Sequence, residues 1–417
     1  MQKVLEEKIN GKSSKREIKL EGKIQLNIDR SNAFTIGKTC VKGIIQVLRS
    51  DIIIDGSNAE IEADINDCTT SDWSLFFIPP MSRNVTLKNM RIRVRIQNSI
   101  HSSRKFYTIF NAAYGLKVQN CHIEMYSDKQ LNMVVIYNNG NLDTHMETRA
   151  DNLVIENSLL KVECRAHEFE KECSVYGICN YLANSISLQN NFIYATNRGN
   201  GERQKAIGVY TNGRFGRFVG NNIKANAAHN VGREKEQAYA FGFINEGLYS
   251  IITSNNIVGE WAGMSVGLEN RGEFTVVSGN KILATHTICG RSIRNYGSKT
   301  NIEGNVLTST SRNARLIEHT AHNCIICRNM MEILMVQSEC RSGCGIYAIG
   351  ENCTENIISE NIIRNVADCA IFADRSVGAI LNNQVTSFKE TINQAGTENV
   401  YLASKLDEKN IQSIYQN

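Results

Sequence analysis

The chain has 417 residues, 42% of them hydrophobic, with 46 Lys and Arg against 42 Asp and Glu and a formal net charge of +4. This charge is too small for a typical nucleic-acid-binding protein, and no run approaches the roughly 18 apolar residues of a membrane-spanning helix, so we expect neither partner. The N-terminus has no apolar signal sequence and the 13 cysteines are odd in number, so we expect reduced thiols in a cytoplasmic protein or in a phage or virus particle component made in the cytosol.

The chain begins with a charged segment that shows no repeat. We predict that residues 1–20 are a flexible N-terminal tail. The only two prolines are adjacent, Pro79 and Pro80, so no proline-rich linker divides the rest of the chain. The sequence therefore predicts a single domain over residues 21–417.

A closing motif recurs along this predicted domain. Asn-x-x-Ile ends at Ile61, Ile92 and Ile123, and similar closures fall at Leu160, Ile193, Ile223, Ile363 and Val385. Units this short cannot bury an apolar face alone, so they must stack on one another. Insertions follow several of these closures at one point of the unit. They would form a wall beside a trough for an extended polymer, unless the variation in loop length has no meaning.

Residues 91–96 alternate arginine with Ile or Val, which is typical of a strand with one face in the core. Arg91, Arg93 and Arg95 then share the outer face. They would grip uronates or sulfates through paired hydrogen bonds, or else form a solvated face whose aliphatic stems are covered.

Four copies of a seventeen-residue unit begin at residues 241, 266, 291 and 315. The first three have Asn at position five and Gly at position seven, and all four have Asn at position fifteen. Apolar residues recur at positions three, twelve and seventeen. Short runs of Ile, Val and Phe separated by Asn and Gly indicate strands and turns, with the Asn residues stacked in ladders that serve the turn backbones. We expect the position-seven glycines to adopt an unusual backbone conformation.

These repeats lack the Leu-rich frame or helical period of other solenoids. The sequence resembles the right-handed parallel β-helix, or pectin-lyase-like, superfamily, and this resemblance implies an all-β solenoid of about twelve coils. Residues 263–282 also look like a coil of the inulin fructotransferases. That weaker resemblance would put Glu269 on an acidic active-site stretch, although Ala262 stands near the expected place of a second carboxylate, with Glu260 two residues before it.

Position four carries the candidate chemistry, because it reads Ile244, Glu269, Arg294 and Glu318 in successive copies. Alternation along a strand predicts that it faces outward, with the two glutamates about 9–10 Å apart, twice the coil spacing. This separation suits an acid and a base acting on a glycosidic bond, with Arg294 between them and His319 assisting proton transfer. A surface ladder of salt bridges is the alternative.

Position six reads Glu246, Arg271, Tyr296 and Thr320, and the first three would bind sugar rings unless they are solvated turn residues. The cysteines Cys324, Cys327, Cys340 and Cys344 have zinc-like spacing. Strand alternation would place Cys324 and Cys327 on opposite faces, however, so we expect buried thiols, no metal and no cofactor.

The sequence therefore predicts a carbohydrate-active enzyme of lyase, hydrolase or fructotransferase type, with a polysaccharide or oligosaccharide along the β-helix groove. The alternative is a non-catalytic glycan-binding or phage appendage protein. A homotrimer is a further expectation, and a trimerisation tail would favour this alternative.

Overall fold

The computed structural model describes residues 1–11, 16–27, 32–36, 39–65, 72–97, 105–128, 131–140, 150–165, 172–199, 203–227, 238–285, 288–334, 342–366, 369–374, 377–387, 390–395 and 402–403. They form two compact units, residues 1–217 with 221–236 and residues 218–220 with 237–417, where the sequence predicted one domain. Coils of a solenoid contact only their neighbours, so a solenoid has no single core that joins the whole chain.

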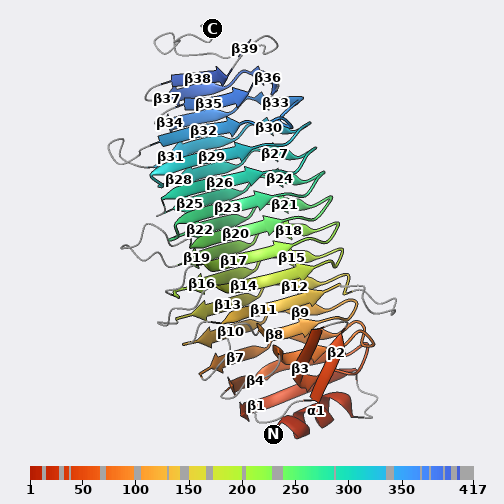
Figure 1. Ribbon diagram of the computed structural model, residues 1–417. Coiled ribbons are helices and arrows are strands. Elements are labelled where there is room, and N and C mark those ends of the chain that lie inside the picture. Colours follow the sequence, from red (N-terminus) through yellow and green to blue (C-terminus); the bar gives the residue numbers. More distant parts are fainter. Residues whose placement is uncertain are drawn as a thin grey trace. The chain divides into compact units, whose positions relative to one another are not determined.

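Parallel strands of successive coils pair in register within the first unit (Figure 1). One sheet contains β1 (Glu17–Asn27), β4 (Ile53–Ile65), β6 (Thr86–Lys88), β7 (Arg91–Ile96), β9 (Lys117–Gln119), β10 (His122–Ser127), β12 (Val154–Glu156), β13 (Leu159–Cys164), β15 (Ser187–Gln189), β16 (Phe192–Asn197) and β19 (Asn222–Ala227). The other contains β2 (Asn32–Ile36), β3 (Thr39–Gln46), β5 (Asp72–Ile78), β8 (Lys105–Asn111), β11 (Asn132–Asn139), β14 (Glu172–Tyr181) and β17 (Arg203–Thr211), with β2 and β3 antiparallel.

The second unit repeats the same pattern of two sheets. One contains β18 (Arg217–Val219, of which Phe218 and Val219 belong to this unit), β21 (Ile251–Thr253), β22 (Asn256–Glu260), β24 (Val276–Ser278), β25 (Lys281–Thr285), β27 (Asn301–Glu303), β28 (Val306–Ser309), β30 (Ile325–Cys327), β31 (Met330–Ile333), β33 (Asn356–Ser359), β34 (Ile362–Val366), β36 (Gly378–Leu381), β37 (Gln384–Ser387) and β39 (Leu402–Ala403). The other contains β20 (Tyr239–Asn245), β23 (Met264–Asn270), β26 (Cys289–Asn295), β29 (Asn313–His319), β32 (Ser342–Ala348), β35 (Cys369–Asp374) and β38 (Glu390–Ala395).

A helix replaces part of the flexible tail predicted for residues 1–20. Helix α1 (Gln2–Asn10) buries Leu5 and Ile9. Its polar side chains bond the backbone of β3 and the residues just after it: Asn10 Nδ2 donates to the Gln46 carbonyl at 2.7 Å, and Asn10 Oδ1 accepts from the Leu48 amide at 2.8 Å. Strand β1 also starts within the predicted tail. No helix in the described part of the chain has the length and apolar character needed to span a membrane.

Both predicted asparagine ladders are confirmed. Asn245 Nδ2 donates to Asn270 Oδ1, and Asn270 Nδ2 to Asn295 Oδ1, each at 2.7 Å. The position-fifteen ladder runs at 2.9–3.0 Å through Asn255, Asn280, Asn305, Asn329, Asn361 and Asn383. These buried amides also bond turn carbonyls, as with Asn245 Nδ2 and the Gly247 carbonyl at 3.2 Å. Their role is therefore to satisfy buried polar backbone.

The sequence predicted an unusual backbone conformation at the position-seven glycines, and this prediction is wrong. The left-handed backbone falls two residues later, at Tyr249, Phe274 and Lys299, which are not glycines. Glycine is needed at position seven because of close packing between coils. A Cβ on Gly272 would lie 1.9 Å from the carbonyl oxygen of Gly247, which no side chain can accommodate.

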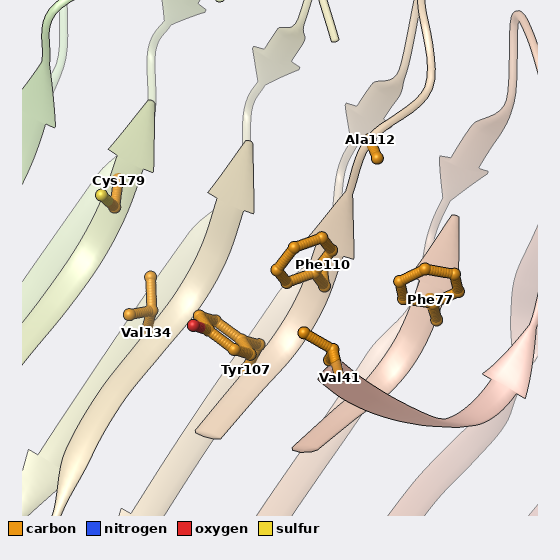
Figure 2. Close-up of a cluster of buried hydrophobic side chains, with 7 residues drawn as sticks. All are labelled: Val41, Phe77, Tyr107, Phe110, Ala112, Val134 and Cys179. Atoms are coloured by element: carbon orange, nitrogen blue, oxygen red, sulfur yellow. The ribbon is translucent and has the colours of Figure 1, made fainter. Parts of the chain in front are cut away.

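Aromatic side chains build a buried cluster on the second sheet of the first unit. Phe77 and Phe110 stack at 5.6 Å between ring centroids, and Tyr107 meets Phe110 edge-on at 5.1 Å. Figure 2 shows them beside Val41 of β3 and Val134 of β11. Phe110 and its register partners in this unit, Tyr137, Cys179 and Tyr210, directly precede the interior residues Asn111, Asn138, Asn180 and Thr211. This outer position is therefore occupied by aromatic residues and one cysteine in these four coils, and Phe77 and Gln46 continue the column in the two coils before them.

Candidate functional site

In the second unit, charged residues occupy this outer position, which is position four of the repeat. Strand register aligns seven successive residues there: Ile244, Glu269, Arg294, Glu318, Tyr347, Phe372 and Asn393. Each precedes the interior position that holds Asn245, Asn270 and Asn295 in the first three coils. The charged residues therefore occupy three consecutive coils, and the coils next to them carry an apolar residue on one side and aromatic residues on the other. A solenoid coil of this kind has no structural need for a glutamate there.

Glu269 lies deeper than the sequence predicted. Strand alternation placed it on an outer surface, but only 1% of its side chain is exposed. Arg271 Nη2 contacts Glu269 Oε1 at 2.6 Å, and Arg294 Nη1 contacts Oε2 at 3.2 Å. Both oxygens are thus held by guanidinium groups, which offset the cost of removing a carboxylate from water.

Glu318 is bound by three arginines. Its Oε2 contacts Arg291 Nε at 2.6 Å and Arg315 Nη1 at 2.9 Å, and its Oε1 contacts Arg294 Nε at 3.3 Å. Burial by itself would raise the pKa of Glu318, but Arg291, Arg294 and Arg315 together hold it below its ordinary value. The Glu318 carboxylate is therefore ionised at neutral pH, so it has no proton to donate and could act only as a base.

Arg294 joins the two carboxylates, as predicted for the residue between them. Its Nη2 also donates to the hydroxyl of Tyr296, whose ring lies 5.2 Å from the guanidinium carbon. Tyr296 is 37% exposed, and partial burial raises the pKa of its phenol. Tyr296 therefore carries a proton at neutral pH beside an ionised base.

The remaining predicted binding residues extend the network by one coil. Arg271 spans from Glu269 to Glu246, whose Oε1 lies 2.9 Å from Arg271 Nη1. At the other end the Arg315 guanidinium stacks on Tyr347, 3.6 Å from its ring centroid. We call Glu246, Glu269, Arg271, Arg291, Arg294, Tyr296, Arg315 and Glu318 the arginine–glutamate network.

His319 does not belong to this network, in contrast to its predicted role in proton transfer. It follows Glu318 directly, so its side chain points to the opposite face of β29, and it is fully buried. It takes the place of asparagine in the interior ladder, where Asn295 Nδ2 lies 3.1 Å from His319 Nδ1. Burial lowers its pKa to about 4, so the imidazole is neutral.

Sequence reasoning missed Arg291 and Arg315. Both occupy position one of their repeats, where the first two copies have Phe241 and Val266. The replacement of apolar residues by arginine in the coil of Glu318 and in the coil before it was the available signal. That these side chains reach Glu318 three residues away, or in the next coil, only the structure shows.

Of the cysteines with the zinc-like spacing, Cys344 lies beside Arg315 in the next coil, and Cys324 is buried in the interior. The Cys324 thiol, 1% exposed, contacts the carbonyl of Gly297 at 3.5 Å, as expected for a buried thiol. Cys340 lies outside the described residues. Among the residues that the structure describes, no three His, Cys, Asp or Glu side chains gather in a metal-binding arrangement. In the network, guanidinium groups neutralise the carboxylates.

No family model matches the chain, and no curated protein matches it in sequence. Solved structures do. The tailspike protein of E. coli bacteriophage HK620, in complex with a pentasaccharide, matches with a TM-score of 0.59 and 13% identity over 99% of this chain and 72% of that one. A mannuronan C-5 epimerase A-module from Azotobacter vinelandii matches with a TM-score of 0.46 and 11% identity over 96% and 95%. The Dettilon tailspike protein matches with a TM-score of 0.44 and 11% identity over 81% of this chain and 62% of that one.

Proposed function

We propose that this right-handed parallel β-helix, of the pectin-lyase-like type, is a carbohydrate-active enzyme that cleaves glycosidic linkages at the arginine–glutamate network. The observation that carries the proposal is the column itself. Its outer position is apolar or aromatic in the neighbouring described coils, yet three consecutive coils place Glu269, Arg294 and Glu318 there. Buried and partly buried charges weaken a fold more often than they stabilise it, so a cluster of them indicates a functional site.

The protonation states favour one division of roles. Glu318 is the base, because three arginines keep its carboxylate ionised. Tyr296 is the proton donor, in place of the buried His319, because its phenol keeps its proton at neutral pH. Arg294 lies between them, and the four arginines of the network against its three glutamates would attract an anionic group of the sugar. The other predicted binding residues, Arg271 and Glu246, extend the surface along the chain of the glycan.

An ionised base and a neutral phenol fit elimination from a uronate better than hydrolysis by two carboxyl groups. In elimination, Glu318 takes the proton from the carbon atom that bears the sugar carboxylate. The electron pair of the broken carbon–hydrogen bond then forms a carbon–carbon double bond. The glycosidic oxygen leaves and takes a proton from Tyr296. Hydrolysis by a carboxyl pair would need one carboxyl with a raised pKa, and Glu318 has the opposite shift.

A second function, glycan binding without catalysis, is favoured by a specific observation. Every oxygen of Glu269 and Glu318 contacts an arginine, so the network is also a stable structure in which no carboxylate awaits a substrate. In this function the chain would be part of a phage or virus appendage. The predicted homotrimer belongs to this proposal and is tested by light scattering of the purified protein.

A product screen separates the two functions. The protein is incubated with fructans, uronans and capsular polysaccharides, and mass spectrometry identifies the products: an added water for hydrolysis, an unsaturated end for elimination, an anhydride for transfer. Tyr296→Phe and Glu318→Gln should each lower turnover about a hundredfold or more, the usual scale for a lost acid or base.

The matched control is Glu303→Gln, which removes a half-buried partner of the exposed Arg328 outside the network and should leave turnover unchanged. Folding of every variant is checked by circular dichroism. Full activity in both network variants would place the reaction elsewhere on the chain. Binding of a glycan without any turnover would establish the non-catalytic function.

A further inference from the structure

The first unit contains a polar pocket of about 570 Å³ that has no part in the proposed catalytic function. It lies over the ends of β7, β10 and β13, where the sequence showed the three alternating arginines. Its lining consists of Arg93, Arg95, Ile96, Gln97, Glu124, Tyr126, Ser127, Asp128 and Arg165. The volume lies within the range of about 300–1,000 Å³ that is typical of small-molecule sites.

A buried carboxylate fixes the orientation of one arginine of this pocket. Arg165 Nε and Nη2 contact the two oxygens of Glu163 at 2.8 and 3.1 Å, and the Glu163 side chain is only 4% exposed. The pKa of Glu163 would rise through burial, but Arg165, Lys161 and Arg198 lower it, so the anchor stays charged. This paired contact leaves Nη1 of the half-exposed Arg165 for a ligand, with its orientation already fixed.

The other two arginines differ in their partners. Arg93 contacts Glu62 at 3.4 Å and Glu124 at 3.5 Å, so its charge is neutralised. Arg95 is exposed, and no ion pair joins it to a carboxylate within the described ranges. Strand register places Arg95 beside Tyr126 and Tyr126 beside Glu163, so Arg95 and the Glu163 that holds Arg165 lie in the coils on either side of Tyr126.

The rest of the lining suits a hydroxyl-rich ligand. Gln97, Ser127 and Asp128 bring amide, hydroxyl and carboxylate groups, and the Tyr126 hydroxyl lies 3.4 Å from Lys161 Nζ. Ile96 and the Tyr126 ring are the apolar parts of the lining. A mostly apolar ligand would find few partners here, whereas a sugar can pair its hydroxyls and place its ring near the tyrosine.

We propose that this pocket binds one or two residues of an acidic saccharide, with the anionic group on Arg95 and Arg165. The site would bind without catalysis and is independent of the arginine–glutamate network. Carboxylated and sulfated sugars share the anionic chemistry that the two arginines recognise, and the experiment separates them.

The test is calorimetric titration of the full-length protein with tetragalacturonate, a sulfated disaccharide, the neutral maltotetraose and inorganic sulfate. We expect an acidic saccharide to bind, more weakly at high salt, and the neutral sugar to fail. Arg95→Gln should weaken binding at least tenfold. Arg91→Gln is the matched control, because Arg91 shares the strand and the outer face of Arg95 but does not line the pocket.

Equal losses in the two variants would show unspecific attraction and overturn the site, as would unchanged binding in Arg95→Gln. Equal binding of maltotetraose would overturn the anionic specificity, and binding of sulfate as tight as that of the saccharides would show a simple anion site. Tyr296→Phe, in the other unit, should bind the acidic saccharide at this pocket as the wild type does. Failure of this proposal is therefore distinct from failure of the proposed catalytic function.

Discussion

The neutral state of His319 couples folding to pH. Its pKa is about 4 in the folded protein and 6.5 in its ordinary state. Between these pH values His319 binds a proton in the unfolded chain but not in the folded one. Its contribution to the free energy of unfolding is therefore fully present above pH 6.5 and is lost as the pH falls toward 4. The shift corresponds to a loss of about 3 kcal/mol.

We predict that His319→Asn abolishes this loss. Asparagine occupies the same ladder position at Asn245, Asn270 and Asn295, so the variant continues a pattern that the fold already uses. Urea unfolding measured at pH 7, 6, 5 and 4.5 should show a smaller decline for the variant than for the wild type. Parallel declines would mean that His319 is not held neutral by burial.

Glu318 should matter for stability as well as for activity. An exposed ion pair contributes at most about 1 kcal/mol, the value that an outward-facing column implied. The structure instead pairs Glu318 with Arg291, of which only 8% is exposed. Glu318→Gln leaves that arginine buried without an anionic partner, and we predict a loss of about 3 kcal/mol in unfolding free energy. Glu303→Gln, which removes an exposed ion pair, should cost less than about 1 kcal/mol by the same urea titration. Similar small losses in both would show that Arg291 is solvated.

At the scale of the coil, two kinds of glycine should respond differently to substitution. Gly272 has an ordinary backbone, but its Cα faces the Gly247 carbonyl of the adjacent coil. Gly279 has a φ of 61° with open space around it, and Ser254 takes the same conformation at the equivalent position.

We predict that Gly272→Ala forces the coils apart and costs several kcal/mol, since backbone cannot move aside as a flexible side chain does. Gly279→Asn should stay within about 1 kcal/mol, because asparagine tolerates the left-handed region. Thermal unfolding of both variants is the measurement. A larger loss at Gly279 would mean that backbone conformation limits these turns more than contact between coils.

At the scale of the whole molecule, stability comes from backbone ladders, amide ladders and an apolar core in each unit. The ten cysteines among the described residues are free, and nine of them are buried. We therefore predict that strong reductant and exhaustive chelation leave the melting temperature unchanged. A fall of several degrees with chelator would point to a metal bound outside the described residues, and a fall with reductant to a disulfide there.

The sequence by itself determined the fold because each coil of a solenoid corresponds to one repeat of the sequence. Residues that stack in space recur at a fixed spacing, so Asn245, Asn270 and Asn295 could be aligned without coordinates. The same alignment found the Glu269, Arg294 and Glu318 column. It could not show depth, and Glu269 proved to be buried beneath arginines.

Only the tertiary structure decided which side chains meet. Arg291 joins Glu318 because its long side chain crosses between coils, which spacing along one strand does not reveal, and Arg315 joins it from the same strand. His319 is not part of the site because its side chain faces the core, whereas that of the preceding Glu318 faces outward. The pocket contains Arg95 and Arg165, which are 70 positions apart in the sequence. They lie close together because two coils separate them along the chain, and the lengths of these coils differ from the regular repeat. Local pattern fixes the coil, but the contacts of a site form between coils, where only three-dimensional packing sets them.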